Sequence, residues 1–312
     1  MAHTQWTSTF AGTTLVHFQD WGQSFTDAFG DVGLTLITPL TPAAGGASTT
    51  WAAVASRPAA TPQSYYEVWA LPTAMTPVSP IYIKVWYGTK TASQHAMSFV
   101  VGTDPAVTGV FAALAGTHTY ASGLTGDQNY LSCDGWGMAL HCGNTASASS
   151  VQSNFWFVVD RHRAVDGTPL RTGTAAYSAG NNPTNNNFFQ QQAQFDHAAT
   201  VPTVRTSSIA IAPCISPGFS TSAARIDSTG RTQICPWWGV TPNSRGLSKM
   251  IGSYNVANHP AGVTEVDVDF LGMTEEPYLA MGAPSGSASA SASALLTSSR
   301  DYGASMVLWW GA

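Results

Sequence analysis

Three carboxylate side chains alternate with apolar residues late in the sequence, at Glu265, Asp267 and Asp269. In a strand, a two-residue period places all three on one face, roughly 7 Å apart. Such a row is compatible with a divalent cation site or with the paired carboxylates of a glycosidase. The same alternation is also typical of a solvated strand face above an apolar core. We favour the solvated face.

The segment Asp160-Arg161-His162-Arg163 lies at the end of another predicted strand. A catalytic interpretation makes His162 a general base that is oriented by Asp160. The alternative is a polar strand end with an ordinary salt bridge, which we favour. From a neighbouring strand or subunit, Arg161 or Arg163 would also compensate the negative charge of the three alternating carboxylates.

A metal pair is suggested by the adjacent residues His141 and Cys142, but two further ligands are not evident. We therefore expect His141 to be a core or loop histidine. The cysteines are Cys133, Cys142, Cys214 and Cys235. They form no Cys-x-x-Cys pair, and Cys133 and Cys142 could face each other across a hairpin. We expect free thiols, because a chain made in a cytosol is kept reduced. We expect no metal site, because ligand motifs are lacking, and no cofactor.

A Trp-Trp-Gly signature occurs twice, at Trp237 and Trp238 and again at Trp309 and Trp310. Exposed aromatic rings can form a sugar-binding platform, whereas buried rings fill a core or a seam between subunits. The second pair follows a strand pattern, so one indole should lie on each side of the sheet. We predict an interface or a sugar platform at these four residues.

Motifs of common enzymes are not found in the sequence. It contains no phosphate loop, dinucleotide fingerprint, Gly-x-Ser-x-Gly elbow or His-Glu-x-x-His pair. We therefore predict no catalytic residues and a protein that is not an enzyme.

Charged residues make up only 9% of the 312 residues, and the net charge is −5. A typical soluble domain has about 25% charged residues. Charge keeps free monomers apart in solution, so its scarcity predicts a surface that other protein subunits cover. Nucleic acid is not expected as a partner, because Lys and Arg do not cluster. We see neither a signal peptide nor a membrane-spanning segment, so we expect synthesis in a cytosol.

Strand patterns of period two recur along the chain and are bounded by Gly, Pro, Asn and Ser. The segments are 65–70, 81–87, 96–101, 154–160, 208–212, 264–270 and 305–310. Segments 81–87 and 96–101 predict a hairpin. No window predicts a helix of ten or more residues, although a short helical turn is expected near Val107–Leu114. The fold class is all-β, an antiparallel β-sandwich or jelly-roll-like fold with long irregular loops.

One large β-rich domain over residues 1–312 is expected, with a candidate subdivision near 175–200. Three segments rich in small, polar or turn-forming residues predict loops or linkers. They are Pro39–Thr50, Gly180–Asn187 and the Ser-Ala stretch Pro284–Ser293.

Three segments together resemble virion structural proteins of tailed bacteriophages. Tyr66–Ala70, Ser79–Gly88 and Phe99–Thr103 are similar to a Trp-containing strand, a Pro-led strand ending in Tyr-Gly and a Val-Gly-Thr strand in products of short-tailed phage structural gene clusters. The C-terminal Tyr302–Trp310 fits less specifically. The resemblance implies a β-rich component of the tail, collar or capsid surface, and no catalytic residue carries over.

The expected function is that of a non-enzymatic virion subunit, made in the host bacterial cytoplasm and located in the virion. Its expected partners are further copies of itself, as in a ring or trimer, and other virion proteins. A host-glycan receptor-binding module of a phage tail is the alternative. A third hypothesis, a polysaccharide depolymerase using carboxylates among Glu265, Asp267, Asp269 and Asp160, has the least support.

Overall fold

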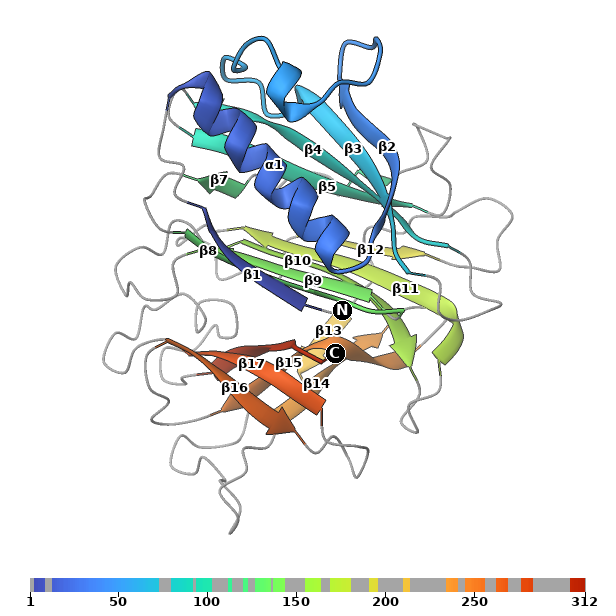
Figure 1. Ribbon diagram of the computed structural model, residues 1–312. Coiled ribbons are helices and arrows are strands. Elements are labelled where there is room, and N and C mark those ends of the chain that lie inside the picture. Colours follow the sequence, from blue (N-terminus) through green and yellow to red (C-terminus); the bar gives the residue numbers. More distant parts are fainter. Residues whose placement is uncertain are drawn as a thin grey trace.

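The computed structural model describes residues 3–8, 13–72, 80–91, 94–102, 112–113, 120–122, 127–135, 137–143, 155–163, 169–180, 191–195, 210–213, 234–240, 245–255, 262–268, 276–282 and 304–311. These residues form two β-sheets, one α-helix and one 3-10 helix (Figure 1). All pairings between described strands are antiparallel. The predicted all-β antiparallel class is confirmed, while the sandwich and jelly-roll forms stay predictions.

Helix α1 (Leu15–Asp31) shows that the prediction of no helix of ten or more residues was wrong. The side chain of Thr14 caps the helix by accepting a hydrogen bond from the His17 N–H. Aromatic residues recur every three or four positions and are fully buried: Phe18, Trp21, Phe25 and Phe29. This spacing is the apolar stripe of an amphipathic helix. It was missed because aromatic and glycine residues have low helix propensity.

The smaller sheet has six strands. They are β2 (Thr35–Pro42), β3 (Tyr65–Ala70), β4 (Tyr82–Thr91), β5 (Gln94–Gly102), β6 (Ala112–Ala113) and β7 (Tyr120–Ser122). Their order is β2-β3-β4-β5-β6, and β7 also pairs with β5. Register pairs Ile83 with Val101 and Tyr87 with Met97, which confirms the predicted hairpin. The connection between β2 and β3 contains the 3-10 helix η1 (Trp51–Ala53).

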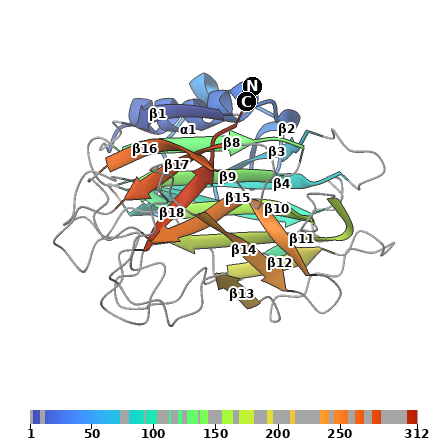
Figure 2. The same ribbon diagram turned by 90° about the horizontal axis from the view of Figure 1, so that it is seen from below.

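The larger sheet has twelve strands. They are β1 (His3–Ser8), β8 (Asp127–Cys133), β9 (Gly137–Gly143), β10 (Phe155–Arg163), β11 (Pro169–Gly180), β12 (Gln191–Phe195), β13 (Ala210–Pro213), β14 (Ile234–Val240), β15 (Arg245–Asn255), β16 (Gly262–Val268), β17 (Glu276–Gly282) and β18 (Ala304–Trp309). β10 pairs with β9 as far as Asp160 and with β15 at Arg163. The register also shifts between Arg161 and Arg163, where β10 pairs with β11. Figure 2 shows β13–β18 from below.

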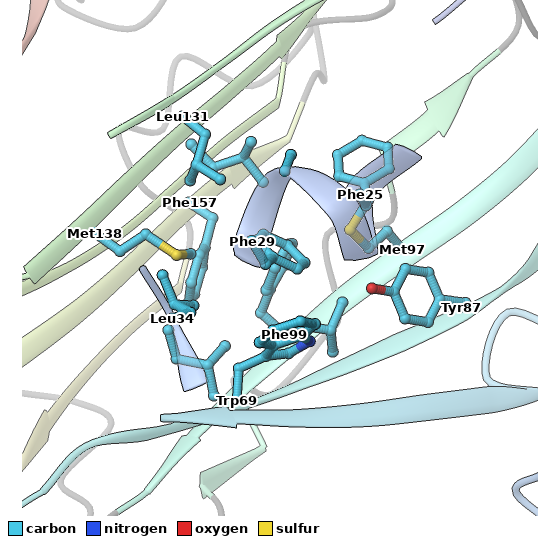
Figure 3. Packing of buried hydrophobic residues seen from close by; sticks show 14 of the residues in the cluster. Phe25, Phe29, Leu34, Trp69, Tyr87, Met97, Phe99, Leu131, Met138 and Phe157 are labelled. Carbon is cyan, nitrogen blue, oxygen red and sulfur yellow. The ribbon is translucent and has the colours of Figure 1, made fainter. Parts of the chain in front are cut away.

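The main core lies between the two sheets, with α1 against the six-stranded one (Figures 1 and 3). The phenyl rings of Phe99 and Phe157 stack at 4.1 Å and so join the sheets. Trp6 of β1 packs edge-on against Phe25 of α1, with ring centroids 5.1 Å apart. Strands from distant parts of the sequence therefore pack against the buried face of the helix.

The predicted loop Pro39–Thr50 is partly wrong, because its first four residues belong to β2 and only the rest form a connection. The predicted helical turn at Val107–Leu114 is wrong at Ala112 and Ala113, which form β6. The rest of that turn, residues 181–187 and residues 284–293 lie outside the described residues. The subdivision near 175–200 stays a prediction.

Candidate functional site

The two Trp-Trp-Gly signatures lie on strands that flank β15. Trp237 and Trp238 belong to β14, which pairs with β15 on one side. Trp309 belongs to β18, which pairs with β15 on the other side. β18 also pairs with β17, where Trp309 lies opposite Tyr278. Two sequence segments about seventy residues apart therefore lie in one sheet. The repeated Trp-Trp-Gly motif alone could not predict this arrangement.

Trp310 is a packing residue in this structure, with 7% of its surface exposed. Its indole stacks on the His3 imidazole at 4.2 Å and meets the Tyr130 ring at 6.1 Å. The backbone N–H of Trp310 donates to the carbonyl oxygen of Pro277 at 2.9 Å. His3 Nδ1 donates to the carbonyl oxygen of Gly311 at 3.1 Å, so these contacts join the two ends of the chain.

Two of the three alternating acids, Glu265 and Asp267, lie in β16, while Asp269 lies outside the described residues. β16 is the last strand in the order of the larger sheet. Register places Glu265 opposite Leu279 and Asp267 opposite Pro277. The predicted strand is therefore confirmed, and the role of the carboxylates stays a prediction.

The polar strand end contains a buried arginine. Arg161 lies in β10, and burial lowers its pKa to about 10 while the nearby Asp134 acts in the opposite direction. Asp134 follows β8, so a carboxylate from the β8–β9 turn compensates the guanidinium charge. Asp160, His162 and Arg163 lie in the same strand.

The β8–β9 hairpin carries the predicted Cys and His residues. Cys133 and Cys142 are both buried and are not joined by a disulfide, and burial raises the pKa of Cys133 well above its ordinary value. They do not face each other, because register pairs Cys133 with Met138 and Cys142 with Asn129. His141 is a core histidine whose pKa burial lowers to about 3. Among the described residues, no three His, Cys, Asp or Glu side chains gather as metal ligands.

The helix-facing side of the six-stranded sheet holds a buried carboxylate that sequence reasoning missed. Glu67 of β3 is 1% exposed. Its Oε1 accepts a hydrogen bond from Thr26 Oγ1 at 2.8 Å. Its Oε2 accepts from Trp69 Nε1 at 3.1 Å and from Tyr87 OH at 2.9 Å. One side chain therefore connects α1, β3 and β4.

The hydrogens in this network have a defined direction. Trp51 Nε1 can only donate, and it donates to Thr26 Oγ1 at 2.8 Å. The Thr26 hydroxyl is then free to donate to Glu67. Three donors directed at one carboxylate favour its ionised form, while burial has the larger effect and raises the pKa of Glu67. Burial and the Glu67 charge raise the pKa of Tyr87 in turn.

A buried imidazole lies beneath the first turns of α1. His95 of β5 is fully buried, and its ring centroid lies 5.5 Å from that of Phe18 and 5.0 Å from that of Trp21. Among the described residues, neither ring nitrogen has a hydrogen-bond partner. Burial has the largest effect and, together with the nearby Arg57 and His17, lowers the His95 pKa to about 3.

The opposite face of the six-stranded sheet holds a buried cation. The Lys84 ammonium lies 3.9 Å from the centroid of the Tyr66 ring and 4.2 Å from that of Trp86. Burial lowers the pKa of Lys84, and the two rings offset part of that cost through cation–π attraction. Both rings alternate with core-facing residues of β3 and β4, so they pack on the face away from α1.

These buried groups are enclosed in the fold. Glu67 and His95 are not accessible to a substrate from the surface, because both side chains are shielded from solvent. Their chemistry is therefore that of core polar groups, which orient their neighbours and make stability depend on pH. A signal for Glu67 is present in the sequence, since it is a lone acid between aromatic residues of a strand.

The fold and these sites define an antiparallel all-β protein with a helix packed on its smaller sheet. No protein-family model matches the chain, and neither a curated protein nor a solved structure matches it. In the part of the chain that the structure describes, no helix combines the length and the apolar character that crossing a membrane requires.

Proposed function

We propose that this protein is a non-enzymatic structural subunit of a bacteriophage virion, placed in the tail, the collar or on the capsid surface. It acts by contacts with copies of itself and with other virion proteins. The proposal joins the resemblance of three strand segments to phage structural proteins with the scarcity of charged residues.

One surface feature carries the proposal. The sequence from Val32 to Ser56 contains no Asp, Glu, Lys or Arg, yet most of its residues are exposed. The exposed side chains are chiefly Ala, Gly, Thr, Ser and Pro, together with Leu36 and Ile37. Interfaces between subunits are depleted of charged residues at their centres. A surface of this composition is suited to contact with protein.

The test is the mass of the purified full chain in solution, measured by light scattering over a range of concentrations. The proposal predicts an oligomer of defined mass. It also predicts that electron microscopy of phage particles places the chain in the virion by antibody labelling. A monodisperse monomer at high concentration, together with unlabelled particles, would overturn the proposal.

A glycan array and saccharide titrations of tryptophan fluorescence separate this function from receptor binding. A structural subunit changes in neither assay. Glycan binding would instead favour the receptor-binding alternative, with a platform among Trp237, Trp238 and Trp309, since Trp310 is buried.

A further inference from the structure

Helix α1 is held in two different ways along its length. Residues 15–21, which we call the first half, pack against the buried imidazole of His95. Residues 23–31, which we call the second half, contain Thr26, whose hydroxyl donates to Glu67. The two halves therefore rest on a histidine and on a carboxylate, and burial makes the stability contributions of these two groups respond to acid with opposite sign.

His95 is enclosed by aromatic side chains of the first half. It is fully buried, and its ring centroid lies 5.5 Å from that of Phe18 and 5.0 Å from that of Trp21. Among the described residues, neither ring nitrogen has a hydrogen-bond partner. Protonation would place a full charge and two donors among these rings without compensation. Acid therefore favours an arrangement in which His95 reaches water.

The surroundings of His95 do not stabilise a positive charge. Titratable side chains act on His95 or contact the two rings that enclose it: His17 of α1, Arg57 of the connection between η1 and β3, Tyr65 of β3 and Tyr87 of β4. Arg57 and His17 both oppose protonation of His95. The Tyr87 hydroxyl already donates to Glu67. Asp20 lies on the exposed side of α1, so no carboxylate of the described residues offsets a charge on His95.

A weak point separates the two halves of α1 at Trp21 and Gly22. Glycine has a lower helix propensity than any residue except proline. The Ser24 hydroxyl donates to the carbonyl oxygen of Trp21 at 2.7 Å, and bonds of this kind often bend helices. The Trp51 indole lies against Gly22 and donates to Thr26, so it holds the second half from its first turn onward. The helix can therefore bend at Gly22.

Release of the first half exchanges its polar contacts for water. The Gln19 side chain donates to the carbonyl oxygens of Ala52 and Val54, at 3.3 and 3.0 Å, and water can replace these bonds. The larger cost is exposure of the fully buried Phe18 and Trp21. That cost sets the opening equilibrium at neutral pH, and the charge of the imidazole changes it in acid.

We propose that acid releases the first half of α1 from the sheet, with protonation of His95 as the trigger and Gly22 as the hinge, while the second half stays docked. The second half is held more firmly in acid, because burial raises the pKa of Glu67 and the neutral carboxyl is the better buried group. This device is independent of the proposed function, since it needs no partner.

The test is hydrogen exchange of the full chain at pH 7 and pH 5, measured by mass spectrometry and corrected for intrinsic amide rates. The pKa of His95 is 6.5 in water and about 3 in the closed helix, so linkage predicts a loss of protection of about twenty-fold at residues 18–21. These amides should also be less protected than residues 26–31 at both pH values. Their exchange should be insensitive to low urea concentrations, because the opening is local.

His95→Leu removes the trigger and should abolish the pH dependence at residues 18–21. His141→Leu is the matched control, because His141 is also a buried histidine whose pKa burial lowers to about 3, yet it lies in β9 of the larger sheet. This control should keep the twenty-fold loss. Glutamine, which is neutral at every pH, replaces leucine at either position if circular dichroism shows that the leucine variant is unfolded.

Equal protection of both halves, with the same loss between pH 7 and pH 5, would mean that the chain opens as a whole and would overturn the hinge at Gly22. A loss in the first half that persists in His95→Leu would overturn His95 as the trigger. Protection of the first half that stays constant in the wild type would overturn the acid release itself.

Discussion

The indole ring of Trp51 lies directly against the backbone of Gly22, in the middle of α1. A methyl group at Gly22 would overlap the Trp51 ring. The same indole donates its N–H to Thr26 one helical turn later. Helix α1 is therefore docked by one aromatic side chain through both shape and a hydrogen bond.

Gly22→Ala should destabilise the protein by about 1–3 kcal/mol, because overpacking outweighs the better helix propensity of alanine. Gly30→Ala is the control, since Gly30 lies in the same helix with nothing within 4 Å of the added methyl. It should be neutral or stabilise by up to ~1 kcal/mol. Urea unfolding measures both, and equal effects would contradict the close packing of Trp51.

Tyr87→Phe should cost about 1.5–3 kcal/mol, because it removes a donor from a buried charged acceptor and leaves Glu67 less satisfied. Tyr82→Phe is the control on the same strand, half-buried on the opposite face. It should change the free energy of unfolding by no more than ~0.5 kcal/mol. A Tyr87→Phe variant as stable as Tyr82→Phe would show that the hydroxyl contributes little.

Glu67 should make folding stability fall as pH rises. Its pKa in the folded state is raised above the ordinary 4.5, so the folded state holds the proton more tightly than the unfolded state. The contribution is complete below pH 4.5 and is lost as pH rises through the raised pKa. Glu67→Gln should remove this slope. Urea unfolding at a series of pH values measures it, and a slope unchanged in Glu67→Gln would assign it to another group.

His95 should act with the opposite sign. Its pKa falls from 6.5 to about 3 on folding, so the unfolded state binds the proton first. Stability is then lost as pH falls from 6.5 towards 3. His95→Leu should be neutral or stabilising at pH 7, because the ring nitrogens have no partners among the described residues, and should reduce the loss at acid pH. A large destabilisation at pH 7 would instead indicate a required polar contact.

Local pattern predicted seven of the eighteen described strands. Tyr65–Ala70 was located to the residue, and the hairpin of β4 and β5 followed from two alternating segments with Gly near their ends. Such signals are local, because alternation and turn residues act over a few positions. The stripe of Phe18, Trp21, Phe25 and Phe29 is equally local, and it was missed although its spacing of three and four residues is the signal of an amphipathic helix.

The sequence by itself determined the antiparallel all-β class, the positions of seven strands and the scarcity of charge, because composition and alternation are local properties of the residues. Only the tertiary structure decided that Glu67 is enclosed by Thr26, Trp69 and Tyr87. It alone decided that β14 and β18 flank β15, and that β2 is a terminal strand of the smaller sheet among the described strands. These features depend on pairings between segments far apart in the chain, and local preference does not specify which strands become neighbours.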